Sequence, residues 1–226
     1  PKMVNFSIFN VPWERRMQTL AVLSFVIALP LTFICLLGSI VLLFWYPLNM
    51  PFLAYLLYIY LDNAQFTGNR MSPWFRNLRW WVNFKEYFPI TLIKTKDLEP
   101  DGKYIFGYHP HGIIGLGAIS TFGTNGCGFN KLYPGIRVHL TTLRTNLNIP
   151  FLRELWLSLG ICAADRKTFH SVLSQPGRAV AVVVGGAAES LKASPGTLDL
   201  CLAHRKGFVR QALLHDAALV PVLAFG

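Results

Sequence analysis

This chain of 226 residues carries little charge: only 14% of its residues are Asp, Glu, Lys or Arg. Soluble domains average about 25% charged residues, whereas 53% of this chain is hydrophobic, so the composition indicates contact with a membrane. Acidic residues are especially scarce, 11 against 21 Lys and Arg, which gives a net charge of +10. In so apolar a chain the positive excess favours anionic headgroups or a phosphorylated substrate. No zinc-finger, RNA-recognition or basic-helix pattern is present, so we expect no nucleic-acid partner.

Several catalytic motifs are also missing. Neither GxGxxG nor a P-loop sequence occurs, so dinucleotide and nucleoside-triphosphate chemistry have no support. The nucleophile elbow GxSxG is absent, and its nearest match, 156–160, lacks the first glycine, which counts against a serine esterase. The four cysteines include no CxxC pair, and we expect them to be reduced, structural thiols. The sequence places no third ligand beside the HxH pair at 109–111, so we expect no metal.

Residues 20–61 form a stretch of 42 residues without one Asp, Glu, Lys or Arg. As a helix this stretch would extend about 63 Å, enough for two crossings of a hydrocarbon core about 30 Å thick. We therefore predict a transmembrane hairpin with spans at 20–37 and 40–61, turning at Gly38 and Ser39. Basic residues flank both ends, which predicts that both ends face the cytosol. An alternative topology has one span, 20–45, and an interfacial helix, 52–61.

The rest of the chain divides around this hairpin. We expect a cytosolic segment at 1–19, an aromatic and basic segment for the headgroup zone at 62–102, and a catalytic domain at 103–226. In this domain strand and helix patterns alternate, which predicts an α/β fold, a mixed sheet with flanking helices. The final strand is apolar like a buried one, so we expect a further C-terminal region to cover it. Strands are expected at 104–108, 136–142, 161–164, 179–184 and 219–225, and helices at 113–122, 150–159, 167–173 and 207–215.

The chain is organised around the stretch 104–112, an apolar strand that ends at His109, Pro110, His111 and Gly112. Pro110 stiffens the loop that holds the two imidazoles, and Gly112 lets the backbone turn. A strand end followed by a helix start is a suitable place for a general base beside backbone donors. The alternative is a plain turn with two hydrogen-bonded histidines, since HxH alone is a weak signal.

At this motif the chain resembles the type 2 diacylglycerol acyltransferase family, which also contains monoacylglycerol and wax-ester acyltransferases. The stretches 12–16 and 18–20 look most like the animal mono- and diacylglycerol branch. Asp216 departs from the pattern, because the family usually has glycine there. The ordered blocks that carry the resemblance are 87–89, 109–112, 134–137, 184–191, 205–210 and 219–226.

The resemblance implies an acyltransferase-like fold and the esterification of diacylglycerol by a fatty acyl-CoA, which yields triacylglycerol. The acyl-CoA is a co-substrate, and no other cofactor is implied. It implies residence in the endoplasmic reticulum membrane with the catalytic domain facing the cytosol, the lipid-droplet surface as a second location, and a homo-oligomer as one assembly. Monoacylglycerol and fatty alcohol stay open as acceptors. Two other classes also stay open: a lipid-binding scaffold without catalysis, and an acyl hydrolase that uses water.

Within that resemblance we assign roles to single residues. His111 is the expected general base, His109 supports or orients it, and Glu189, just past a buried strand, is the expected carboxylate partner. The alternative for Glu189 is a glutamate favoured by the macrodipole at a helix start. The expected oxyanion donors are backbone amides near Gly112, Gly185 and Gly186. The expected ligands of the acyl-CoA phosphates are Arg205, Lys206, Arg210 and Arg137, with Arg144, Arg166 and Lys167 as reserves.

Overall fold

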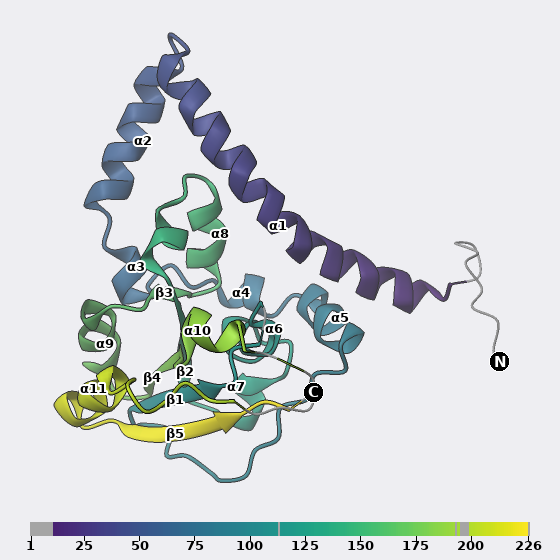
Figure 1. Ribbon diagram of the computed structural model, residues 1–226, viewed down its shortest axis with the longest axis vertical. Coiled ribbons are helices and arrows are strands. Elements are labelled where there is room, and N and C mark those ends of the chain that lie inside the picture. The colour runs from purple at the N-terminus through teal and green to yellow at the C-terminus, as the bar shows by residue number, and fades with distance from the viewer. Residues whose placement is uncertain (1–10, 113, 193, 195–198, 226) are drawn as a thin grey trace.

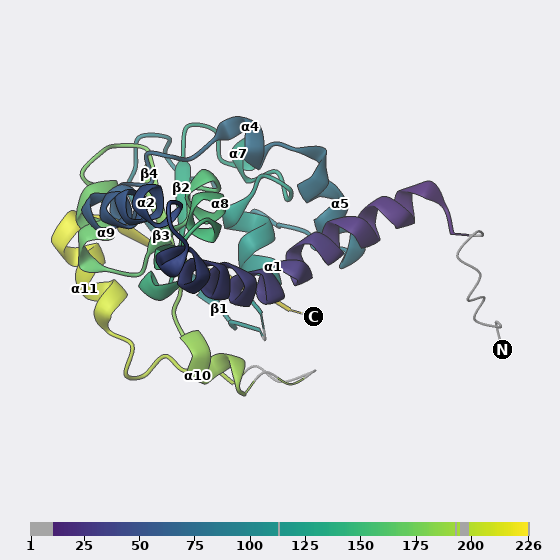
Figure 2. The same ribbon diagram turned by 90° about the horizontal axis from the view of Figure 1, so that it is seen from above.

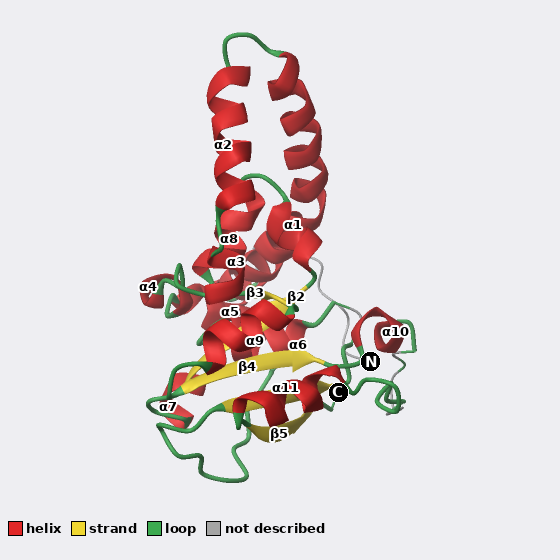
Figure 3. Cartoon of the chain, turned by 90° about the vertical axis from the view of Figure 1, so that its left-hand side faces the viewer, coloured by secondary structure: helices red, strands yellow, loops and turns green. Residues whose placement is uncertain are grey.

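The computed structural model describes residues 11–112, 114–192, 194 and 199–225. Two apolar helices, α1 (Trp13–Phe44) and α2 (Asn49–Leu61), form a hairpin that rises from an α/β domain (Figure 1). Figure 3 shows the two helices side by side above the sheet. Helix α1 bends by 41° between Trp13–Ala28 and Pro30–Phe44, because Pro30 lacks the N–H that a helix interior needs. The first half of α1 packs along α5, and the second half rises away from the domain to the turn before α2 (Figure 1).

The predicted turn at Gly38 and Ser39 is wrong. Helix α1 continues through both residues, and the Ser39 hydroxyl donates to the Cys35 carbonyl within the helix. The chain turns instead at 45–48, around Pro47. The reason is energetic: a glycine inside a helix costs only about 1 kcal/mol, whereas proline costs about 3 kcal/mol. Among the described residues no single helix is long and apolar enough to cross a membrane, although the two halves of α1 together reach that length and composition across their bend.

Five strands form one sheet in the order β3-β2-β4-β1-β5. Every pairing is parallel, so the prediction of a mixed sheet is wrong. Parallel neighbours need crossover connections, and helical segments lie between each strand and the next along the chain. The four cysteines are free, as predicted. The strands are β1 (Tyr104–His109), β2 (Arg137–Thr142), β3 (Cys162–Ala163), β4 (Arg178–Val183) and β5 (Ala218–Leu223).

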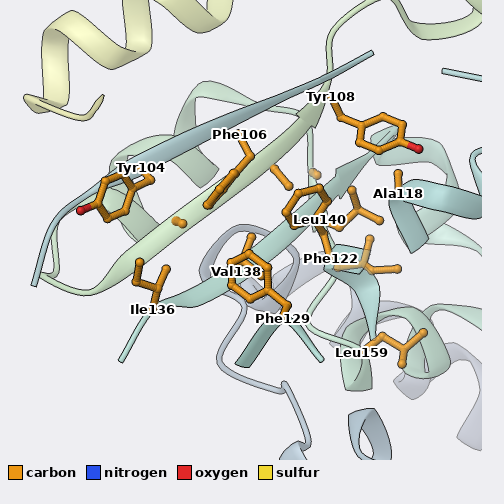
Figure 4. Packing of buried hydrophobic residues seen from close by; sticks show 14 of the residues in the cluster. Tyr104, Phe106, Tyr108, Ala118, Phe122, Phe129, Ile136, Val138, Leu140 and Leu159 are labelled. Carbon is orange, nitrogen blue, oxygen red and sulfur yellow. The ribbon is translucent and has the colours of Figure 1, made fainter. Parts of the chain in front are cut away.

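Helices cover both faces of this sheet, and strand β1 is buried along its whole length. Alternate side chains of a strand point to opposite faces. Tyr104, Phe106 and Tyr108 therefore enter the larger core, where they pack with residues such as Phe122 (Figure 4). Ile105 enters a second core on the opposite face. That second core is made with α9 (Arg166–Leu173) and α11 (Gly207–His215), while α6 (Leu116–Ala118), the π-helical turn η2 (Ile119–Gly123) and α7 (Phe129–Leu132) contribute to the first.

Most predicted elements of this domain are present within two residues of their expected bounds. One difference lies directly after residues 109–112, which we call the histidine loop. There the predicted helix 113–122 is broken into α6 and η2. In η2 the Thr124 N–H donates to the Ile119 carbonyl at 3.0 Å, a five-residue step. Single π-turns of this kind are frequent at functional sites. Residue 113 lies outside the described residues, as do positions 1–10 of the predicted cytosolic segment.

The aromatic segment and the last strand also differ from expectation. Some of the segment 62–102 is core, since Trp81 and Phe84 are buried while Trp74 is 73% exposed. Strand β5 lies at the edge of the sheet and is mostly exposed, so the covering C-terminal region stays a prediction. The remaining helical elements are α3 (Ala64–Thr67), α4 (Pro73–Arg76), α5 (Arg79–Tyr87), the 3-10 turn η3 (Arg144–Asn148), α8 (Leu152–Ser158) and α10 (Gly186–Ser190).

Candidate active site

Two neighbouring strands bring the predicted catalytic residues to one edge of the sheet. Strands β1 and β4 are parallel and in register, with Tyr108 opposite Val183, so their carboxyl ends lie together. His109 ends β1, and Glu189 lies in the short helix α10 that follows β4. In open parallel sheets the crevice outside the carboxyl ends of the strands is the usual place for a ligand.

The Glu189 carboxylate is the centre of this arrangement. Its side chain is fully buried, with Oε2 3.2 Å from His109 Nδ1. Oε1 accepts a hydrogen bond from the His111 backbone N–H at 2.7 Å, and Oε2 accepts one from the Cys201 N–H at 2.9 Å. A buried carboxylate needs such donors, because desolvation would otherwise be very costly. Glu189 therefore ties the histidine loop to the chain after β4, which exceeds the role of a helix-start glutamate.

The hydrogen-bond partners also assign a tautomer to each imidazole in its neutral form. A carboxylate and a carbonyl oxygen only accept, so the Nδ1 facing each of them carries the proton. His109 Nδ1 faces Glu189, and His111 Nδ1 donates to the Gly112 carbonyl at 2.7 Å. Each neutral ring then keeps Nε2 as an acceptor. The two rings differ in the charge of the group that each contacts. His109 contacts a carboxylate, which can stabilise a protonated imidazole, whereas His111 contacts a neutral carbonyl.

This geometry changes one predicted contact. We expected Glu189 to be the carboxylate partner of His111 as the base, but the ring that Glu189 contacts is that of His109. Glu189 reaches His111 only through the backbone N–H. The catalytic role of His111 itself stays a prediction.

The predicted glycines lie at the same edge, and each has a physical reason to lack a side chain. Gly112 and Gly186 have φ angles of 64° and 56°, which glycine adopts readily and other residues rarely do. At Gly185 an added Cβ would lie 2.1 Å from Oε2 of Glu189, so only glycine allows the carboxylate to approach. Their role as oxyanion donors stays a prediction. The His111 amide already donates to Glu189, and the next amide after Gly112 belongs to a residue outside the described ranges.

The predicted cations divide into two groups. Arg205 lies near the site, where its guanidinium donates to the Gly185 carbonyl at 3.4 Å. Lys206, at the N-cap of α11, and Arg210, in its first turn, are both exposed. Arg137 begins β2 and therefore lies at the amino edge of the sheet, opposite His109. Its assignment to the acyl-CoA phosphates stays a prediction, which this position does not favour. The reserves Arg144, Arg166 and Lys167 follow the carboxyl ends of β2 and β3.

Two participants were not predicted. The Cys201 amide holds Glu189, and a backbone donor in a loop leaves no signal in the side-chain pattern. Arg76 is buried and donates to the carbonyls of Phe122, Val138 and Leu159. Burial, with a smaller contribution from nearby Arg137, lowers the Arg76 pKa to about 10, so it stays charged at neutral pH. Arg76 lies in the segment 62–102, which we predicted for the headgroup zone, but its side chain fastens η2 to β2.

A metal would need several ligands close together. Within the described ranges no group of three or more His, Cys, Asp or Glu residues is placed to hold a metal ion. The chemistry that this edge supports is proton transfer by an imidazole paired with a buried carboxylate.

Comparison with known proteins finds similar sequences along almost the whole chain. Residues 40–226 match the protein family described as Diacylglycerol acyltransferase. The chain is 44% identical to Diacylglycerol O-acyltransferase 2A of Umbelopsis ramanniana, with 98% of this chain and 62% of that protein covered. It is 43% identical to Diacylglycerol O-acyltransferase 2 of Xenopus laevis, with 96% and 63% covered. It is also 43% identical to 2-acylglycerol O-acyltransferase 1 of Bos taurus, with 99% and 68% covered.

The chain thus spans slightly less than two thirds of the fungal and frog relatives. No solved structure matches it significantly. The family match covers the histidine loop, the carboxylate that it contacts and all five strands of the sheet. The chain therefore belongs to the type 2 diacylglycerol acyltransferase family.

Proposed function

We propose that this chain transfers a fatty acyl group from acyl-CoA to the free hydroxyl of diacylglycerol and so makes triacylglycerol. The observation that carries the proposal is the contact between His109 and the buried Glu189 at the carboxyl edge of the sheet. A thioester is already activated, so the demanding steps are removal of the alcohol proton and stabilisation of an oxyanion. Membership of the family and the names of the relatives support this reaction.

In the proposed mechanism His109 acts as the general base in place of His111. Its Nε2 accepts the proton of the acceptor hydroxyl as the alcohol oxygen bonds to the thioester carbonyl carbon. Glu189 stabilises the imidazolium that forms, as the carboxylate of a catalytic triad does. When the carbon–sulfur bond breaks, His109 returns the proton to the departing CoA sulfur. Atoms and charge balance without a covalent enzyme intermediate.

We propose that the hairpin anchors this chemistry in the membrane of the endoplasmic reticulum, with the domain on the cytosolic side and lipid droplets as a second location. The outer faces of α1 and α2 support an anchor, because Phe33 and Phe44 of α1 are 68% and 84% exposed and Leu57 of α2 is 59% exposed. Contiguous exposed apolar surfaces of this kind mark membrane or protein contacts. An acyl chain and a neutral glyceride would then reach the site laterally from the lipid.

The first experiment measures transfer of labelled oleoyl-CoA in microsomes from cells without their own triacylglycerol synthesis. Diacylglycerol, monoacylglycerol and fatty alcohol are offered in parallel. We expect diacylglycerol to be the best acceptor, with monoacylglycerol second because a relative is named 2-acylglycerol O-acyltransferase 1. Removal of a general base typically lowers the rate by about 10²-fold or more, so His109→Ala should do so. The matched control, His170→Ala, removes an exposed histidine of α9 and should keep full activity.

Other outcomes would contradict the proposal in distinct ways. Full activity in His109→Ala would exclude His109 as the base, and a larger loss in His111→Ala would return that role to His111. Release of free fatty acid without ester would indicate a hydrolase. Lipid binding without either product, and unchanged in both variants, would indicate a scaffold.

A further inference from the structure

An apolar pocket of about 180 Å³ lies beneath the first half of α1. One wall is α1 itself, and the others come from the aromatic segment, the π-helical turn η2 and the end of α8. Figures 1 and 2 show how α1 crosses these elements. The lining residues are Ser24, Phe25, Ala28, Phe75, Trp80, Trp81, Ile119, Leu155, Trp156 and Leu159.

Of the four polar side-chain atoms of this pocket, three are hydrogen-bonded, and the Trp156 indole N–H has no partner within the described part of the chain. Trp80 Nε1 donates to the Ser24 hydroxyl at 2.9 Å, and that hydroxyl donates to the Ala21 carbonyl at 2.7 Å. Trp81 Nε1 donates to the Phe75 carbonyl at 2.7 Å. A bound water needs two to four polar partners, so this lining favours a hydrocarbon occupant over water.

The pocket lies between α1 of the hairpin and the turn η2, which follows α6 in the chain. Ile119 begins η2, and its N–H donates at 3.0 Å to the carbonyl of Gly115, the residue before α6. On the other side, Phe25 of α1 packs edge-on against Phe84 of α5, with ring centroids 5.3 Å apart. The same helix that carries the exposed apolar surface thus roofs the pocket. A lipid chain moving along α1 would meet this apolar space.

We propose that this pocket binds part of the hydrocarbon chain of an acyl lipid substrate. The proposal rests on the proposed acyl-transfer function, since it names where the chain lies when the ester group is at His109. Pockets for whole ligands measure about 300–1,000 Å³, so a pocket of about 180 Å³ would hold only one portion of a long chain. The chain belongs either to the acyl-CoA or to the glyceride, and the two sources share the same chemistry here.

The test uses photo-crosslinking, which does not depend on turnover. The membrane-bound full chain is irradiated with oleoyl-CoA or with diacylglycerol, each carrying a diazirine in its acyl chain, and labelled residues are identified by mass spectrometry. We expect label on Trp156 or Leu159, which line the pocket from the domain side. Label from the acyl-CoA probe would assign the pocket to the donor chain, and label from the diacylglycerol probe to the acceptor chain.

Filling the pocket should abolish that label. Ala28→Trp places an indole in the cavity and should lower labelling of Trp156 and Leu159 by about tenfold or more, with Ala28→Leu intermediate. The matched control is Ile27→Trp, because Ile27 is its neighbour on α1 but is 53% exposed. Unchanged labelling in Ala28→Trp, or label confined to the outer face of α1, would overturn the proposal. Ester formation with label elsewhere would reject the pocket alone, whereas pocket label without ester would reject the proposed function alone.

Discussion

The buried ionisable side chains of this protein differ in the groups with which they form hydrogen bonds. His109 contacts the carboxylate of Glu189. The partners of His139 include the Gly160 carbonyl, and Arg76 donates to three backbone carbonyls. A carboxylate can compensate a positive charge on an imidazole, and a carbonyl does so only weakly. Of these two histidines, His109 is therefore the one suited to take up a proton during a reaction. His139 is suited to stay neutral.

His139 gives the fold a predictable dependence on pH. Burial is the main cause that lowers its pKa to about 4, from about 6.5 in an unfolded chain. Between these values the unfolded state binds a proton that the folded state does not, so the free energy of unfolding falls as the pH drops from about 6.5 to about 4. The full change is about 3 kcal/mol for this residue. Urea unfolding followed by tryptophan fluorescence at about pH 7 and about pH 4.5 would measure it.

The variant His139→Gln should lose most of this pH dependence while keeping a donor for Gly160. His204→Gln serves as the control, because His204 is exposed and should leave the dependence unchanged. An equally steep pH dependence in His139→Gln and the unchanged chain would contradict the prediction.

At the scale of single residues, the sequence indicates which side chains are candidates for the site but not which of them are in contact. Two histidines around a proline at a strand end, and an acid just past an all-apolar strand, are chemically conspicuous, so His109, His111 and Glu189 were predictable. The ring that meets Glu189 was not, because this depends on how the loop after β1 faces the helix after β4. The Cys201 amide was equally out of reach, since every residue except proline carries the same donor.

The hairpin and the domain are joined by a charged cluster at the end of α2. The Arg153 side chain is fully buried and donates to Asp62 at 2.8 Å and to Glu154 at 2.9 Å. Its Nε also donates to the Leu147 carbonyl at 3.0 Å, and Arg70 contacts Asp62 at 3.0 Å. The cluster fastens the chain leaving α2 to the start of α8, so it sets where the hairpin emerges from the domain.

Removing one partner of a buried ion pair typically costs about 3–5 kcal/mol, because the other charge stays buried and unpaired. We expect Asp62→Ala to lower the free energy of unfolding by less than that amount, since Arg153 and Arg70 would each lose one carboxylate and keep Glu154 as a partner. Asp97→Ala removes an exposed carboxylate paired with Lys94 and should leave stability unchanged. Thermal unfolding of both variants in one detergent would measure the two changes in stability. Equal stability of the two variants would show that the cluster does not hold the junction.

Elements with one dominant signal were predicted well. Helix α11 has its expected bounds, 207–215, and the apolar run in β4 lies in the middle of the sheet. The hairpin turn was misplaced because a glycine–serine pair was given more weight than Pro47. The helix after β1 was predicted as one piece, because the pattern of apolar residues does not distinguish a π-turn from an α-helix.

At the scale of the whole molecule, one parallel sheet carries the His109–Glu189 contact at one edge, and the apolar hairpin rises above it. The parallel order was within reach of the sequence, since helical segments separate all the strands and antiparallel hairpins need only short turns. The strand order β3-β2-β4-β1-β5 was not, because it depends on which faces pack in three dimensions. That order places β1 beside β4, and so joins residues 80 positions apart in the sequence into one site.

The most direct test of this assembly is a double-mutant cycle on acyl transfer to diacylglycerol. The values of kcat/KM are measured for the unchanged chain, His109→Ala, Glu189→Gln and the double variant, with circular dichroism to confirm folding. Groups that act as a unit are strongly non-additive. We predict a loss of about 10²-fold or more in His109→Ala and little further loss when Glu189→Gln is added. The control pair, His111→Ala with Glu189→Gln, should show losses that multiply. Losses that multiply for His109 and Glu189, or non-additivity confined to His111, would contradict the assignment.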